Sequence, residues 1–197
     1  MKILVFSDLH RDVQRAERLV ELAREADVVV GAGDYATMRE GLAGTIEILS
    51  RIEAPTVLVP GNAESDVELV EACASWTSAQ VLHGQGTEID GISFFGLGGA
   101  VPPTPFDWSF DLSEDEAAAK LESCPRAAVL VVHSPPEGYL DKANGRHLGS
   151  RSVLEAIERT QPVLAVCGHI HQCWGGEAGI GTTPVFNVGP DGRLIEI

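Results

Sequence analysis

Basic residues are scarce in this chain. It has 14 Lys and Arg against 29 Asp and Glu, which gives a formal net charge of −15 at pH 7. Long DNA or RNA is a polyanion that binds through basic surfaces, so the composition argues against a nucleic-acid partner. A small phosphate compound is still compatible with this charge, because bound cations can reverse the sign of the field inside one pocket.

Paired cysteines and long apolar runs are also missing. The cysteines stand apart in the sequence, with no C-x-x-C pair, at Cys73, Cys124, Cys167 and Cys173. No apolar run approaches the roughly 20 residues that cross a bilayer. The chain begins with MKILVFSDLH, which we interpret as a core strand and not as an export signal. We therefore expect a cytoplasmic protein with reduced thiols and no membrane contact.

Hydrophobic residues, in contrast, are plentiful. They make up 44% of the 197 positions, enough for the core of one domain spanning 1–197. Short apolar runs predict strands at 2–7, 27–31, 56–59, 127–132 and 163–167. Helical spacing of apolar residues predicts helices over 12–26 and 39–52. This alternation is typical of an α/β fold in which helices cover a parallel sheet.

Local signals add further elements. A Ser followed three residues later by Glu is a capping box, and it predicts helices that begin at Ser65, Ser113 and Ser152. The Asp90–Gly91 pair predicts a tight antiparallel hairpin in the middle of the chain. Residues 97–112 and 135–149 are interpreted as loops. We expect two sheets with flanking helices.

Residues of metal-ligand type follow the predicted strands at their carboxyl ends. They are Asp8, His10, Asp34, Asn62, His133, His169 and His171. Ligands of open α/β sheets bind beyond these strand ends, so the seven side chains are expected at one edge. Residues i and i+2 of an extended segment point to the same side, which would let Asp8 and His10 share one ion. A nitrogen and oxygen set without thiolate suits Mn²⁺, Fe or Zn²⁺ better than Ca²⁺.

The order of these motifs matches a known family. D-x-H, G-D, G-N, H and G-H-x-H, spread from Asp8 to His171, resemble the calcineurin-like metallophosphoesterases. The segments H-S-P-P, H-L-G-S and G-H-I-H are similar to a small phosphodiesterase branch of that superfamily. The resemblance implies a four-layer α-β-β-α sandwich of two mixed sheets flanked by helices. It also implies two divalent metal ions, of which Mn²⁺ is our first choice and Fe or Zn²⁺ the alternatives.

The resemblance also assigns roles to the residues. It implies a first metal held by Asp8, His10 and His171, a second held by Asn62, His133 and His169, and Asp34 bridging both. Two ions that share a water lower its pKa, so that a hydroxide is available near neutral pH to attack phosphorus. We expect hydrolysis of small phosphodiesters, with cyclic nucleotides among the candidates. Asp34, Asn62 and His169 are the expected catalytic residues.

One position departs from the family pattern. The usual motif is G-N-H-D or G-N-H-E, and Ala63 stands here in place of the histidine, followed by Glu64. That histidine contacts the phosphate and can protonate the leaving group, which is typically worth about 10²–10⁴-fold. We therefore expect slow turnover and a preference for diesters. With Asn62, two loop residues are expected to bind substrate: His147, as a replacement for the lost histidine, and Arg146, as a phosphate ligand.

Several alternatives remain open from the residues alone. The chain could be a phosphomonoesterase of the same fold, or a binding scaffold that has lost catalysis. Glu64 either supports the ligand residues or is an ordinary acidic residue at a helix start. For Phe106, Trp108 and Phe110 we favour packing on the core over stacking on a bound base. Oligomeric state is not visible in the sequence.

Overall fold

Two large sheets form the centre of the molecule. The computed structural model describes residues 1–197. The first sheet contains, in spatial order, β13 (Arg193–Glu196), β1 (Lys2–Phe6), β2 (Val28–Gly31), β3 (Thr56–Leu58) and β4 (Ala79–Val81). The second contains β11 (Gly176–Ile180), β12 (Thr183–Asn187), β10 (Leu164–Cys167), β7 (Val129–Val132), β6 (Ile92–Leu97) and β5 (Gln85–Ile89). A separate two-stranded hairpin consists of β8 (Lys142–Ala143) and β9 (Arg146–His147).

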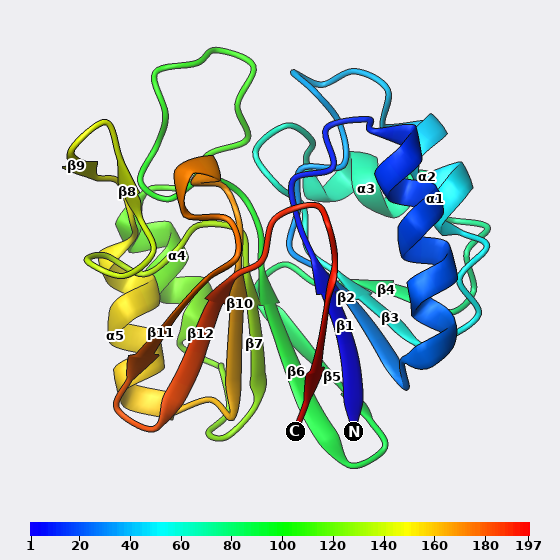
Figure 1. Ribbon diagram of the computed structural model, residues 1–197. Helices are drawn as coiled ribbons and strands as arrows, with labels where there is room; N and C mark the ends of the chain where they lie inside the picture. Colours follow the sequence, from blue (N-terminus) through cyan, green and yellow to red (C-terminus); the bar gives the residue numbers. More distant parts are fainter.

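Helices cover the outer face of each sheet (Figure 1). On the first sheet lie α1 (Val13–Leu22), which continues into the 3₁₀ turn η1 (Ala23–Glu25), α2 (Leu42–Leu49) and α3 (Asp66–Ala72). On the second lie α4 (Glu114–Leu121) and α5 (Arg151–Thr160). A further 3₁₀ turn, η2 (His171–Cys173), follows β10. The expected α-β-β-α sandwich is confirmed.

Both sheets are mixed. In the first, β13 runs antiparallel to β1 and the remaining pairs are parallel. In the second, the central pairs are parallel and the two outer pairs, β11 with β12 and β5 with β6, are antiparallel. Asp90 and Gly91 join β5 to β6 with positive φ angles of 51° and 78°, as a tight hairpin turn requires. The hairpin is therefore confirmed, although β6 also pairs with β7 in parallel.

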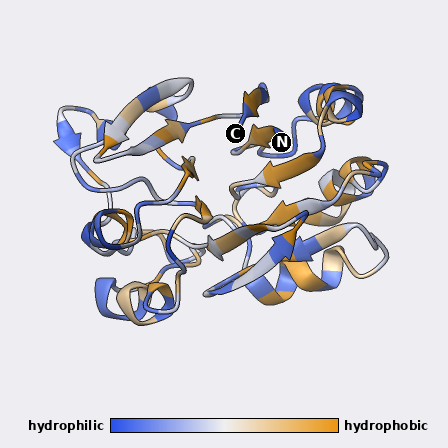
Figure 2. Cartoon of the chain, turned by 90° about the horizontal axis from the view of Figure 1, so that it is seen from below, coloured by the Kyte–Doolittle hydropathy of each residue, from blue (hydrophilic) through white to orange (hydrophobic).

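The alternating directions of the side chains along each strand explain why the two sheets and the helices pack together. Ile3 and Val5 of β1 belong to the core between the two sheets, whereas Leu4 and Phe6 belong to the core under the helices. Successive side chains of a strand point to opposite faces, so a strand buried on both faces is a continuous apolar run. Figure 2 shows the strands as mainly hydrophobic ribbons inside helices that carry hydrophilic residues. No helix has the length and apolar character that crossing a membrane requires.

One predicted helix start is wrong. Helix α5 begins after Ser150, whose hydroxyl accepts the backbone N–H of Val153, and Ser152 lies inside the helix. The expected capping box at Ser152 does not form: the backbone N–H of Ser152 donates to Glu114, and the side chain of Glu155 pairs with that of Arg151. The capping boxes at Ser65 and Ser113 are confirmed at α3 and α4.

The fold gathers the carboxyl ends of β1, β2, β3, β7 and β10 at one edge of the sandwich, the upper edge in Figure 1. The loops that leave these strands carry all seven candidate ligands. The side chains come together from both sheets, because the two sheets face each other across the central core.

Candidate metal centre

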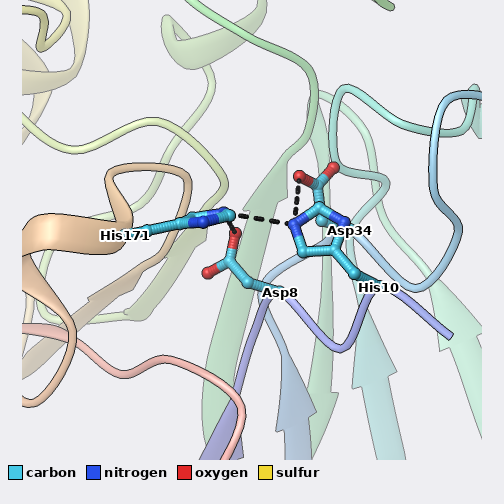
Figure 3. A group of neighbouring side chains, drawn as sticks. All are labelled: Asp8, His10, Asp34 and His171. Carbon is cyan, nitrogen blue, oxygen red and sulfur yellow. Dashed lines mark hydrogen bonds and ion pairs between the residues drawn. The ribbon is translucent and has the colours of Figure 1, made fainter. Parts of the chain in front are cut away.

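The first group of candidate ligands combines residues from both sheets. The ligand atoms of Asp8, His10, Asp34 and His171 all lie within 4.8 Å of one another. In Figure 3 the imidazoles of His10 and His171 point toward each other, with their Nε2 atoms 3.1 Å apart. Nε2 of His10 is 3.5 Å from Oδ2 of Asp34, and Nε2 of His171 is 3.7 Å from Oδ1 of Asp8. Two carboxylates and two imidazoles thus face one point.

The second group shares Asp34 with the first. Its ligand atoms, from Asp34, His133 and His169, also lie within 4.8 Å of one another. Oδ1 of Asn62 is 3.2 Å from Nε2 of His133 and 3.1 Å from Nδ1 of His169. Asp34 turns Oδ1 toward His133 and Oδ2 toward His10. All seven residues expected from the sequence are therefore brought together, and one carboxylate lies between the two groups.

The local backbone differs from the extended segments that we expected. Asp8, His10, Asp34 and His169 all have left-handed conformations, with φ angles of 54°, 45°, 60° and 65°. For residues other than glycine each such angle costs roughly 1–3 kcal/mol and needs support from the surroundings. Backbone bonds provide it, from the N–H of Asp8 to Gly33 and from the N–H of His10 to Asp34. Tight turns, and not strand periodicity, make these ligands converge.

Glu64 ties two of the ligand loops together. Its buried carboxylate accepts backbone N–H groups of Asp34 and Ala36 at 2.9 Å and of Gly61 at 2.7 Å. Burial and the nearby charge of Asp34 raise the pKa of Glu64 to about 7. Of the two roles considered for Glu64, support of the ligand loops is the one that its contacts match.

Gly61 is required in this arrangement, because a Cβ added there would meet Asp34 at 2.0 Å.

Carbonyl oxygens orient two of the imidazoles. Nδ1 of His10 lies 3.1 Å from the carbonyl of Ala36, and Nδ1 of His133 lies 2.8 Å from that of Ala32. Each ring then presents Nε2 to the centre, which is the usual arrangement of metal-binding histidines.

Burial sets the charge state of several ligands. Burial lowers the pKa of His169 to about 3, with the neighbouring His133 adding to the effect, so His169 is neutral at pH 7. Burial also raises the pKa of Asp8. Burial alone would raise the pKa of Asp34 too, but the imidazoles of His133, His10 and His169 outweigh it and lower this pKa. A neutral imidazole and an ionised carboxylate are the forms that bind metals.

A cleft of about 720 Å³ opens beside the centre. Its lining includes Pro102, Phe106, Arg146, His169 and His171. Arg146, expected to bind substrate, therefore lines the same cleft as two candidate metal ligands.

His147 points elsewhere. Its Nδ1 lies 2.7 Å from Oδ1 of Asp141, a buried carboxylate that also accepts the N–H groups of Gly138 and Gly149. His147 does not line the cleft, so a role for it in binding substrate stays a prediction without support from its contacts.

The expected packing of the loop aromatics on the core is wrong for Phe106. This side chain is 52% exposed and stacks on Trp108, with ring centroids 5.3 Å apart and planes 10° apart. Phe110 instead contacts His83, at a centroid distance of 5.4 Å. His83 lies between β4 and β5, which belong to different sheets.

Two supporting residues were missed by the sequence analysis. The hydroxyl of Ser109 accepts the side-chain N–H of Asn62 at 2.9 Å, which leaves Oδ1 of Asn62 facing the centre. The indole N–H of Trp174 donates to Oδ2 of Asp8 at 3.1 Å. Neither residue belongs to a recognisable motif, since both reach the centre only through the tertiary fold.

Comparison with known proteins agrees with this geometry. A family model described as the calcineurin-like phosphoesterase superfamily domain matches residues 1–193. The chain belongs to this superfamily. Members of this superfamily are metallophosphoesterases, which are hydrolases that use divalent metals.

Relatives with known sequences are longer. The UPF0046 protein K07C11.7 of Caenorhabditis elegans is 27% identical over 89% of this chain and 65% of its own length. Metallophosphoesterase domain-containing protein 1 of Homo sapiens is 30% identical over 66% of this chain and 39% of its own length. The chain thus spans less than two thirds of the length of either relative.

Solved structures share the fold at low identity. The protein TT1561 of Thermus thermophilus has a TM-score of 0.78 and 21% identity, covering 96% of this chain and 90% of its own. A dimetal phosphatase of Danio rerio has a TM-score of 0.62 and 13% identity, covering 96% and 87%. At these identities the similarity establishes the fold alone.

Proposed function

We propose that this phosphoesterase is a dinuclear, metal-dependent phosphodiesterase of small molecules, with cyclic nucleotides among its candidate substrates. The observation that carries the proposal is the pair of ligand groups with Asp34 common to both. Their donors are imidazole nitrogens and carboxylate or amide oxygens, with no thiolate, a set that suits Mn²⁺, Fe or Zn²⁺. The residues fit two divalent ions, and Mn²⁺ is our first choice.

The proposed ligands divide as the two groups do. Asp8, His10 and His171 would hold one ion, Asn62, His133 and His169 would hold the other, and Asp34 would contact both. When bound, such a pair supplies Lewis-acid activation of the phosphate and a water of lowered pKa. The protein contributes hydrogen bonds that position the ligand residues, from Glu64, Ser109 and the backbone carbonyl of Ala32.

Asn62 has a particular electrostatic role in this proposal. It is a neutral ligand, so it adds an oxygen donor without adding a negative charge that would repel phosphate. Its amide orientation is fixed by the bond from Nδ2 to Ser109, whose hydroxyl donates in turn to Asp111. Of the proposed catalytic residues Asp34, Asn62 and His169, it is His169 that lines the cleft in which a substrate would lie, and Asp34 and Asn62 lie beside it in the second ligand group.

The preference for diesters rests on Ala63. This residue is buried, 1% exposed, and has no group that could bind a phosphate oxygen or donate a proton. A monoester carries one more negative charge than a diester and loses more from the missing histidine. Arg146, on the wall of the cleft, is the proposed contact for the phosphate or for an anionic part of the substrate.

The test compares two activated aryl esters after reconstitution with Mn²⁺. We expect bis(4-nitrophenyl) phosphate to be hydrolysed with a higher kcat/KM than 4-nitrophenyl phosphate, and Asp34→Asn to lose both activities. A strong preference for the monoester would make the protein a phosphomonoesterase. Failure of the parent to hydrolyse either ester, with the same result for Asp34→Asn, would leave only a binding scaffold.

A further inference from the structure

His171 differs from the imidazoles of His10, in its own group, and His133, in the second group, in how it is held. The rings of His10 and His133 each contact a backbone carbonyl through Nδ1. The only hydrogen-bonding contact of the His171 ring is between Nε2 and His10. Its side chain is also 49% exposed, against 29% for His10 and 0% for His133. Metal-binding histidines are normally fixed by a partner on the other nitrogen, so something else must orient this ring.

Trp174 is packed against that ring. The centroids of the two rings are 4.3 Å apart, with an angle of 32° between their planes. Aromatic contacts at this distance contribute roughly 0.5–1.5 kcal/mol beyond area burial. The indole therefore takes the place of the missing carbonyl, by fixing the plane of His171 instead of its Nδ1 atom.

The same indole acts on a second ligand. Its N–H donates to Oδ2 of Asp8 at 3.1 Å, and the hydroxyl of Ser7 donates to the same oxygen. The other oxygen, Oδ1, accepts the backbone N–H of His169 at 3.0 Å and lies nearest to His171. Two donors thus occupy Oδ2, whereas Oδ1 accepts one and faces His171, so that Oδ1 is the oxygen that Asp8 offers to a cation.

The position of Trp174 is itself fixed by the fold. A Cβ added to Gly189 would meet Trp174 at 2.7 Å, so the indole lies directly on the backbone at Gly189. The side-chain N–H of Asn187 donates to the carbonyls of Gly168 and Ile170, which steadies the turn leading to His171. The indole is therefore placed by β12 and its following loop independently of the two ligands that it contacts.

We propose that Trp174 is a positioning residue for the first metal ion, orienting Asp8 through a hydrogen bond and His171 through ring stacking. This inference rests on the proposed function, because it requires two metal ions. It assigns Trp174 no contact with substrate. Trp174 has no hydrogen bond or ring contact with Asn62, His133 or His169, so we expect its main effect at one of the two ion sites.

Two variants separate the two contacts. Trp174→Phe keeps an aromatic ring beside His171 and removes the N–H donor, whereas Trp174→Leu removes both. Trp108→Phe is the matched control, because Trp108 stacks on Phe106 in the loop beside the cleft and makes no bond to a ligand residue. The affinities of both sites are measured by calorimetric titration of the metal-free full chain with Mn²⁺. Thermal unfolding of the metal-free proteins is recorded in parallel.

We expect Trp174→Leu to weaken one Mn²⁺ site by about 10- to 100-fold, the range typical for residues that orient metal ligands. The Mn²⁺ affinity of Trp174→Phe at that site should lie between the affinities of Trp174→Leu and the parent. The Mn²⁺ affinity of the other site should change little in either Trp174 variant. Trp108→Phe should bind both ions as the parent does. The unfolding temperature of metal-free Trp174→Phe should also stay close to that of the parent. Addition of paramagnetic Mn²⁺ should quench the indole fluorescence of the parent and of Trp108→Phe more than that of Trp174→Phe.

The outcomes distinguish a failure of the positioning role from a failure of the proposed function. If the parent binds two ions and both Trp174 variants bind them with unchanged affinities, the positioning role is refuted and the proposed function stands. Equal weakening of both sites together with a lower unfolding temperature would reduce Trp174 to a structural residue and also refute the proposal. If the parent binds no divalent ion, the proposed function fails, and this inference fails with it.

Discussion

The two halves of the candidate metal centre are built in different ways. In the half formed by Asn62, His133 and His169, the His133 side chain is fully buried, at 0% exposure. In the half formed by Asp8, His10 and His171, the two imidazoles are 29% and 49% exposed. The former, or buried, half is joined to the core between the sheets by the contact of His133 with the carbonyl of Ala32, whereas in the latter, or open, half the His171 ring packs on Trp174. We therefore expect the buried half to bind its ion more tightly and the open half to exchange its ion more readily.

Removal of the shared ligand should have the largest effect, because it acts on both halves. Asp34→Asn takes one negative charge from each group, and we expect the diesterase kcat/KM to fall by at least roughly 10²–10³-fold, as on loss of one strong electrostatic contact. The measurement is steady-state hydrolysis of an aryl diester with saturating Mn²⁺. Asp27→Asn, at the other end of β2, is the control and should keep nearly full activity. Two separate ion affinities that both survive Asp34→Asn would contradict a shared ligand.

The second prediction contrasts the two halves directly through the free energy of unfolding. His133→Ala leaves a cavity in the core and removes the partner of the Ala32 carbonyl, so we expect a loss of about 2–4 kcal/mol. His171→Ala, at a half-exposed position, should cost less than about 1 kcal/mol. Urea unfolding of the metal-free proteins measures both. Similar losses for the two variants would remove the proposed distinction between the halves.

His171 of the open half lines the cleft together with Arg146. A variant of Arg146 therefore tests what the cleft contributes to substrate binding. We expect Arg146→Gln to raise KM for a small phosphodiester by about fivefold and to leave kcat nearly unchanged, because an exposed charge contact is worth up to about 1 kcal/mol. Lys142→Gln removes a charge from the neighbouring strand β8 without altering the cleft lining and is the control. An equal rise in KM for both variants would point to a general effect of charge.

The last prediction concerns a residue outside both halves, and its effect appears only at acid pH. Burial lowers the pKa of His83 to about 4, and its Nδ1 accepts the N–H of Gly98 at 3.3 Å. The unfolded chain therefore takes up a proton more readily, so this contribution to stability is present above about pH 6.5 and is lost as the pH falls toward 4. We expect the unfolding free energy of His83→Gln to decline less than that of the parent between pH 6.5 and 4. Parallel curves for the two proteins would show that His83 makes no such contribution.

Much of the centre was predictable from sequence, because residue type and strand position are local information. Ligand-type residues such as Asp8, Asp34 and His133 follow short apolar runs, and the carboxyl ends of neighbouring parallel strands necessarily share an edge. The backbone conformation was not predictable in the same way. His10 and His169 adopt left-handed angles that only the surrounding loops stabilise.

What the sequence analysis missed depends on contacts between distant segments. The start of α5 is set by Glu114 of α4, whose carboxylate accepts the backbone N–H groups of Arg151 and Ser152. That contact overrides the local capping signal at Ser152. Trp174 likewise reaches Asp8 across 166 positions of the chain, and no local pattern marks such a contact.

The central claim is that two cations lie on either side of Asp34. The most direct measurement is a crystal structure of the Mn²⁺-reconstituted protein, with the anomalous signal of manganese used to locate the ions. We predict two anomalous peaks, one contacted by Asp8, His10 and His171 and the other by Asn62, His133 and His169, with an oxygen of Asp34 at each. A single peak, or peaks that Asp34 does not contact, would contradict the account.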